Sequence, residues 1–247
     1  MLAEIPPEEL SAVLEAVAAE TLAATGVDHP PVDAFAVARA LGITVAADDR
    51  QRGRARYVRL GAHRPTEGKP AILLHGDPRP ERRQWAIAHE IGEHTAHQVF
   101  SRLGVDPWEA SPNARETIAN QLAGRLLLPG DWFAADAADC GWDLFGLKSR
   151  YATASHELIA RRMLECPPPV IISIFDQGEV SFRRSNVPGQ APPPSSAEME
   201  CWRIVHTYAR TECAYDGTSA IHGWPIHEEG WRREILRTEV DEVAIGG

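Results

Sequence analysis

The residues best suited to catalysis or metal binding lie in the segment His89-Glu90-Ile91-Gly92-Glu93. In a helix, residues i and i+4 share a face because each residue turns by about 100°. The zinc-peptidase pattern His-Glu-x-x-His uses this spacing to bring two imidazoles to one metal, with the Glu at i+1 as general base. Here position i+4 is Glu93, and a carboxylate oxygen is also a zinc ligand. The direct interpretation is that His89 and Glu93 bind a metal and Glu90 acts as the general base on a water.

Two further histidines follow closely on the same predicted helix. His94 lies at i+5 from His89, about 100° round from the ligand position unless a π-bulge corrects the turn. His97 shares the face of His89 and Glu93, but it lies about 6 Å further along the axis. Whether either histidine joins the metal ligands stays open at this point.

A third ligand has to come from another element, and Glu116 is the best candidate because it opens the next predicted helix. The helix dipole independently favours an acidic residue in a first turn. An ordinary amphipathic helix, with a solvated polar face and a buried apolar half, also explains the residues around His89. The spacing alone leaves both interpretations open.

Hydrophobic periodicity and turn residues predict the elements that would position these side chains. Helices are predicted at 7–24, 33–41, 80–100, 115–128, 131–138 and 154–165, and strands at 43–45, 55–60 and 71–75. A hairpin is predicted from strands at 170–175 and 179–184. Residues 187–197 are rich in Pro, Gly, Gln and Ser and indicate a linker. Residues 201–240 are interpreted as a small β-rich element.

Composition narrows the function classes. The formal net charge of the 247 residues is −10, which disfavours a general nucleic-acid surface. The short basic run at Arg79, Arg82 and Arg83 is interpreted as a solvated helix face. No apolar run approaches the roughly 20 residues that cross a bilayer, and the acidic N-terminus has no basic n-region. We therefore expect a cytoplasmic protein without a membrane partner, for which nucleic acid is not the main partner.

Two histidine-containing patterns in the C-terminal part are candidate sites. Cys201 and Cys213 with His206 could in principle bind a metal, but the widely spaced cysteines match no Cys-x-x-Cys motif and are taken as reduced thiols. The stretch 221–227 combines imidazoles with Trp224 in a turn-rich setting. A sensor or substrate-docking role was considered, and a structural cap over the preceding domain is the favoured interpretation.

Two blocks of sequence resemble the ImmA/IrrE family of metallopeptidases. Residues 82–92, Arg-Arg-Gln-Trp-Ala-Ile-Ala-His-Glu-Ile-Gly, resemble its active-site helix, in which an Arg and an aromatic precede Ala-His-Glu-Leu-Gly-His. Residues 116–129 resemble its Glu-x-x-Ala-Asn-x-Phe-Ala-x-x-Leu-Leu-Met-Pro helix, whose leading Glu is the third metal ligand. The resemblance extends over about residues 25–185. It departs from the family where Glu93 replaces the second His, giving HExxE in place of HExxH.

This resemblance implies an α+β fold with a gluzincin-like, zincin-like metallopeptidase core. The expected organisation is an N-terminal helix at 1–24 and a core of helices with a small antiparallel sheet at 25–186. A linker at 187–197 and a small C-terminal β-rich appendage at 198–247 would follow.

The resemblance also implies a function. A metal-dependent endopeptidase would hydrolyse a peptide bond in a protein substrate, by analogy a helix-turn-helix repressor in the stress response. His89, Glu93 and Glu116 would bind one divalent metal, zinc first, with manganese or iron as alternatives because carboxylates are harder ligands. Glu90 would be the general base, and Tyr151 or His156 could donate to the oxyanion, although surface or core roles also explain both. The alternative is a catalytically degenerate member that acts as an interaction or regulatory module.

Overall fold

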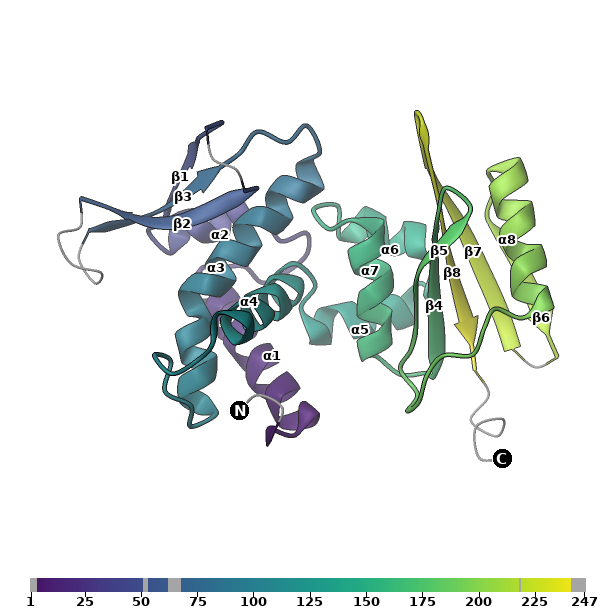
Figure 1. Cartoon of the computed structure of the whole chain (residues 1–247), viewed down its shortest axis with the longest axis horizontal. Coiled ribbons are helices and arrows are strands. Elements are labelled where there is room, and N and C mark those ends of the chain that lie inside the picture. The colour runs from purple at the N-terminus through teal and green to yellow at the C-terminus, as the bar shows by residue number, and fades with distance from the viewer. Residues whose placement is uncertain (1–3, 51–52, 62–67, 218, 241–247) are drawn as a thin grey trace. The chain divides into compact units, whose positions relative to one another are not determined.

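The computed structural model describes residues 4–50, 53–61, 68–217 and 219–240. It is an α+β protein with two small sheets and a β-rich C-terminal region, which confirms the predicted fold class (Figure 1). The chain divides into two compact units, Met1–Ser155 and His156–Gly247. Among the described helices, none is both long and apolar enough to cross a bilayer.

The first unit consists of six helices and a three-stranded sheet. In chain order its elements are α1 (Pro7–Ala24), α2 (Ala34–Ala40), β1 (Thr44–Ala47), β2 (Ala55–Leu60), β3 (Lys69–Leu74), α3 (Pro80–Arg102), α4 (Pro112–Leu127), α5 (Gly130–Asp139) and α6 (Leu144–Arg150). These bounds agree closely with the predicted ones, except that α4 begins at Pro112 and not at residue 115 and that the periodicity did not predict α6. Local chemistry explains the two helix starts that matter most. Pro80 and Pro112 occupy first-turn positions, and the Ser111 hydroxyl caps α4 by accepting a hydrogen bond from the Ala114 amide.

The helices α1, α3 and α4 pack together around one apolar cluster. Its buried members are Leu14, Val17, Ala96, Val99, Phe100, Ala110, Ile118 and Leu122. The burial of these side chains keeps α3 and α4 fixed relative to each other, because apolar area removed from water stabilises by about 25 cal/mol per Å².

The small sheet has the order β1-β3-β2 and packs against α3 through β2 and β3. Whereas an antiparallel sheet was expected, it is mixed: β2 pairs antiparallel with β3, but β1 pairs parallel with β3. The chain passes from β1 to the far edge and returns through the centre, which gives β1 and β3 the same direction. The edge strand β2 consequently lies beside the helix that carries His89.

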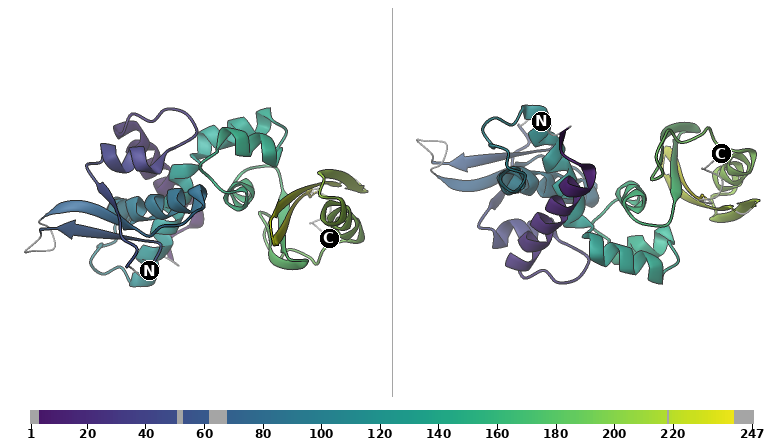
Figure 2. Two further views of the ribbon diagram at one scale, coloured as in Figure 1. Left: turned by 90° about the horizontal axis from the view of Figure 1, so that it is seen from above. Right: turned by 90° about the horizontal axis from the view of Figure 1, so that it is seen from below.

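The second unit is a five-stranded antiparallel sheet with helices on it. Its elements are α7 (His156–Arg162), the 3-10 turn η2 (Met163–Glu165), β4 (Val170–Asp176), β5 (Glu179–Ser185), α8 (Ser196–Tyr208), β6 (Glu212–Asp216), β7 (Ser219–Glu228) and β8 (Trp231–Glu239). The strand order is β5-β4-β8-β7-β6. Figure 2 shows α8 within the curve of this sheet, where it packs on β6, β7 and β8.

Two expectations about this region differ from the structure. The hairpin of β4 and β5 was assigned to the peptidase core, but β4 pairs along its length with β8, so the hairpin belongs to the second unit. The helix α8 was not predicted, because the aromatic and turn residues of 201–240 suggested strands. The missed signal is a capping box, in which Ser195 and Glu198 each accept from the other's backbone amide.

Candidate metal centre

One glycine sets the distance between the two helices that carry the predicted ligands. A Cβ atom at Gly92 of α3 would lie 2.6 Å from the carbonyl oxygen of Ala119 in α4 and 3.1 Å from its Cα atom. Only glycine permits this backbone contact. The close approach brings His89, almost one turn before Gly92, and Glu93, the next residue, near Glu116 in the second turn of α4.

The predicted ligands come together at this contact. His89, Glu93 and Glu116 each offer one ligand atom, and these atoms all lie within 4.8 Å of one another. The Nε2 atom of His89 is 3.6 Å from Oε2 of Glu116, whose side chain is exposed while that of His89 is largely buried. One imidazole and two carboxylates on adjoining helices suit a divalent cation, since all three are established zinc ligands.

A side chain that the sequence analysis did not assign orients this group. Asn120 lies one turn after Glu116 and donates from Nδ2 to Oε1 of Glu116 at 3.0 Å. Its Oδ1 atom lies 3.1 Å from Nδ1 of His89 and can only accept, so that ring nitrogen carries the proton. In the neutral imidazole, Nε2 therefore keeps its lone pair and faces the Glu116 carboxylate. This is the tautomer that metal ligation through Nε2 requires. The i, i+4 spacing of Glu116 and Asn120 was the signal in the sequence.

Glu90 occupies a different environment, on the side of α3 that faces the small sheet. Its side chain is buried, and Oε2 accepts a hydrogen bond of 2.6 Å from the Tyr57 amide on β2. Burial raises the pKa of the Glu90 carboxyl, the Tyr57 and His89 contacts oppose the rise, and the nearby Glu93 and Glu116 carboxylates add to it. A carboxylate with a raised pKa is a stronger base, which is the property that a general base needs.

The other candidate residues lie outside this group. His94 contacts the Tyr57 hydroxyl through Nδ1 at 3.0 Å, and Nδ1 of His97 lies 3.0 Å from the His94 carbonyl oxygen. Tyr151 is fully buried and donates its hydroxyl proton to Asp136 at 2.8 Å, which supports a core role over oxyanion binding. His156 begins α7 in the second unit.

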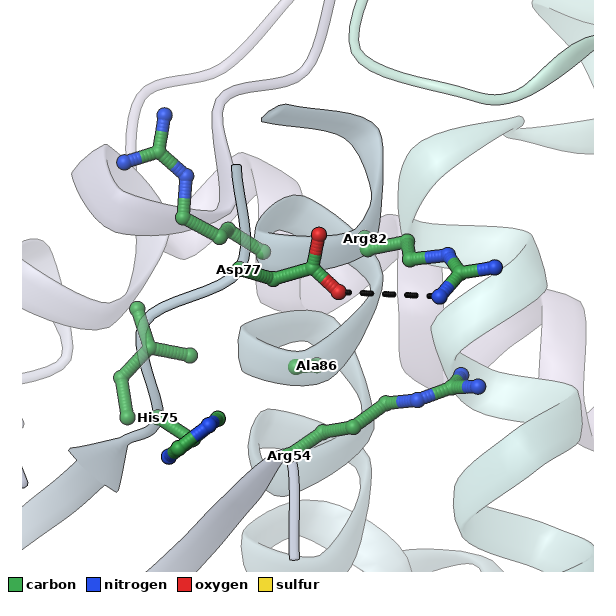
Figure 3. A pocket seen from close by; sticks show the side chains of 7 residues that line it. Arg54, His75, Asp77, Arg82 and Ala86 are labelled. Atoms are coloured by element: carbon green, nitrogen blue, oxygen red, sulfur yellow. Dashed lines mark ion pairs between the residues drawn. The ribbon is translucent and has the colours of Figure 1, made fainter. Parts of the chain in front are cut away.

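The basic run before the ligands borders a small hollow next to the N-terminal turns of α3. It has a volume of about 20 Å³, roughly the space of one water molecule. The hollow is lined by Arg54, Leu74, His75, Asp77, Arg82, Arg83 and Ala86. Figure 3 shows Asp77 turned toward Arg82, with which it forms an ion pair of 3.7 Å. Asp77 also contacts Arg79 at 3.4 Å, so part of the positive charge is compensated within the run.

The cysteine grouping that was weighed for the C-terminal part does not form. Among the described residues, His206 groups as a potential ligand with His227 and Glu234, and not with the cysteines. Cys201 is buried against the sheet, and desolvation raises the pKa of its thiol to about 12. A thiol with that pKa is protonated at neutral pH.

The fold is that of a metallopeptidase-type domain, and the comparison with protein families agrees. The family model of the IrrE N-terminal-like domain, peptidase family M78, matches residues 38–164, just over half of the chain. The chain therefore belongs to this family. The fold is similar to that of a solved Mycobacterium tuberculosis transcriptional regulator, with a TM-score of 0.62 and 18% identity over 95% of this chain and 81% of that chain. No curated protein matches the sequence.

Proposed function

We propose that this chain is a cytoplasmic metal-dependent endopeptidase that hydrolyses a peptide bond in a protein substrate. His89, Glu93 and Glu116 would hold one divalent cation, zinc first, with manganese or iron as alternatives. The observation that carries the proposal is the convergence of these three ligand atoms. The residue directly after His89 is Glu90, a buried carboxyl group with a raised pKa. A bound cation supplies a Lewis acid that polarises the scissile carbonyl and lowers the pKa of water.

The residues of the chain supply the remaining chemistry. Glu90 would accept a proton from the attacking water and return it to the leaving amine. The Tyr57 amide keeps one oxygen of this carboxylate fixed, so the carboxylate does not need to reorient before it reacts. Asn120 keeps the proton on Nδ1 of His89 and orients Glu116. The exposure of Glu116 leaves the group open to an extended polypeptide from solvent.

A transcriptional repressor, such as one of the helix-turn-helix class, is the proposed substrate. Membership of the IrrE-like family and the fold shared with a transcriptional regulator support a role in gene regulation, for instance in a stress response.

A catalytically silent interaction module is the second candidate, and one observation favours it. The Glu90 carboxylate accepts a hydrogen bond from the Tyr57 amide on the edge strand, so it also links α3 to β2 structurally. This structural role requires only the hydrogen bond, whereas a general base requires the ionised carboxylate.

The variant Glu90→Gln separates these two roles. Gln retains an oxygen that accepts from the Tyr57 amide but cannot take up the proton. We expect turnover of a quenched-fluorescence peptide library by the zinc- or manganese-loaded protein to fall by about 10²- to 10⁴-fold. Stoichiometric metal, measured by elemental analysis, should be retained. The exposed Glu109→Gln serves as a matched control with normal turnover. Equal cleavage by Glu90→Gln would contradict the peptidase proposal.

A further inference from the structure

The second unit contains a separate group of potential metal ligands, outside the span of the family match. It consists of His206 on α8, His227 on β7 and Glu234 on β8, whose ligand atoms lie within 4.8 Å of one another. The register of the β7–β8 hairpin pairs His227 with Arg232 and Pro225 with Glu234. His227 and Glu234 are therefore diagonal neighbours on one face of the sheet.

This face is the one that α8 covers. Cys201 and Val205 of α8 pack on Ile221 and Leu236 of the sheet. His206 follows Trp202 by four residues and so projects from the same side of the helix. The group is thus assembled from one helix and two strands of a single packed unit.

The contacts within the group converge on one carboxylate oxygen. Oε1 of Glu234 lies 3.0 Å from Nδ1 of His206 and 2.6 Å from Nε2 of His227. The other oxygen, Oε2, accepts a hydrogen bond of 3.0 Å from the Trp202 indole. The Trp202 ring is itself stacked on the Phe175 ring, with 5.3 Å between the ring centroids. The indole therefore holds Oε2 of the Glu234 carboxylate, while Oε1 is directed at the two imidazoles.

The burial of Glu234 demands a cationic partner. Its side chain has no exposed surface, and an isolated buried carboxylate is costly unless it is paired or coordinates a metal. Within the described part of the chain, the partners of this carboxylate are the two histidines and the indole. Either a protonated imidazole or a shared metal ion can balance its charge.

We propose that His206, His227 and Glu234 form a second metal site, which binds one divalent transition-metal ion of the zinc class. Two imidazoles and one carboxylate are a common three-residue ligand set for zinc with an open fourth position. The histidine side chains are 27% and 18% exposed, which gives that fourth position access to water. The Trp202 hydrogen bond supplies the outer support that metal-bound carboxylates usually have.

The distances indicate how the group would respond to the ion. Ligand atoms around a tetrahedral zinc lie roughly 3.3 Å apart, given bonds of about 2.0–2.1 Å. The contacts of 3.0 Å to His206 and 2.6 Å to His227 must therefore lengthen by about 0.3 Å and about 0.7 Å. The ion takes the place of the hydrogen-bonding protons between the rings and the carboxylate, and each neutral imidazole then carries its proton on the nitrogen that faces away from the ion.

Titration of the untagged, full-length, metal-free protein with zinc tests this proposal. The variant His89→Gln/Glu116→Gln removes the group in the first unit, so the outcome does not depend on the proposed peptidase site. In that background we expect calorimetry to show one zinc bound per chain. Adding His206→Gln or His227→Gln should abolish stoichiometric binding, and adding Trp202→Phe should weaken it by about 10- to 100-fold. His222→Gln, on the same strand but outside the group, is the matched control and should keep one zinc.

The result that overturns the proposal is a background variant that binds no zinc at micromolar concentrations, or one that keeps its zinc after both histidines are replaced. If the histidine variants do not fold, X-ray absorption at the zinc edge of the background variant decides. A shell with two imidazoles and a carboxylate supports the site, and any other shell refutes it.

Discussion

The two ligand groups differ in composition and in the structure around them. The first, at His89, Glu93 and Glu116, has one imidazole and two carboxylates on two helices, and Glu116 is exposed. The second, at His206, His227 and Glu234, has two imidazoles and one fully buried carboxylate. The first group is the more anionic and has an exposed carboxylate, whereas the carboxylate of the second group is buried and already held by the Trp202 indole. The burial of the carboxylate, and not the number of potential ligands, is therefore what separates the two groups.

Both groups also depend on a glycine at a packing contact, but the two contacts differ in kind. A Cβ atom at Gly92 would meet the backbone of Ala119, which cannot move without shifting α4. A Cβ atom at Gly223 would meet side-chain atoms instead, Cγ2 of Val205 at 2.8 Å and Sγ of Cys201 at 3.1 Å. Side-chain ends can yield to an added methyl group more easily than a helix backbone can.

The largest stability effect is expected in the second unit, at the buried ion pair of Glu198 and Arg183. Their side chains are 4% and 9% exposed and lie 2.9 Å apart. Glu198→Gln leaves Arg183 without its charge partner, and we expect a loss of roughly 3 kcal/mol in the free energy of unfolding. Hydrogen exchange followed by mass spectrometry should show the loss in α8 and the sheet, with α3 and α4 unchanged. An equal loss in the first unit would contradict the separation of the two units.

The same residue predicts a pH dependence. Burial alone would raise the pKa of the Glu198 carboxyl, but hydrogen bonds from Arg183, Thr238 and the Ser195 amide outweigh burial and hold the pKa below its usual value. Because the folded-state pKa is depressed, this stabilisation is present above the unfolded-state value of about 4.3 and is lost as the pH falls through the folded-state value. The difference between wild type and Glu198→Gln should therefore shrink on acidification, as measured by urea unfolding from pH 7 to pH 3.

A smaller effect is expected for Gly92→Ala in the first unit. Overpacking costs up to about 3 kcal/mol, and the better helix propensity of alanine returns about 1 kcal/mol. We expect a net loss of about 2 kcal/mol in unfolding free energy and weaker metal binding at His89. Ala119→Gly should not restore stability, because the contact is with main-chain atoms. A fully stable Gly92→Ala protein would mean that the helices tolerate a wider spacing.

The smallest effect is expected for Gly223→Ala, at about 1 kcal/mol. Here the added methyl group meets the ends of side chains, so Val205→Ala in the same chain should recover part of the loss. A double-mutant cycle by urea unfolding measures this coupling. Strict additivity of the two changes would contradict the contact and weaken the contrast with Gly92.

The local pattern of the sequence was sufficient for much of the first unit. Helix α1 begins and ends where periodicity, Pro7 and Gly26 placed it, and β2 matches its predicted range. The pairing of His89 with Glu93 needed only the i, i+4 spacing of a helix. Glu116 was the weaker prediction, because a helix dipole would explain an acidic residue in a first turn equally well. In the structure α4 begins at Pro112, so Glu116 lies in its second turn, and the contact between α3 and α4 brings it to His89.

Other features could not be read from the chain because they depend on contacts between distant segments. The β4–β5 hairpin has an ordinary local signature, but its partner β8 lies some 60 residues later and decides which unit it joins. Asn120 looked like one polar residue among several until its two hydrogen bonds placed it between His89 and Glu116. The hydrogen bond between the Tyr57 amide and Glu90 likewise joins a strand to a helix 33 residues later.

By itself, the sequence determined the helix that carries His89, Glu90 and Glu93, because hydrophobic periodicity and helical spacing are local properties. The tertiary structure alone decided that the ligand atoms of His206, His227 and Glu234 lie close together. Those residues come from one helix and two strands, and the order of these elements in the chain does not predict the distances between their side chains. Only the packing of α8 on the β7–β8 face, through Cys201, Val205, Ile221 and Leu236, brings their side chains together.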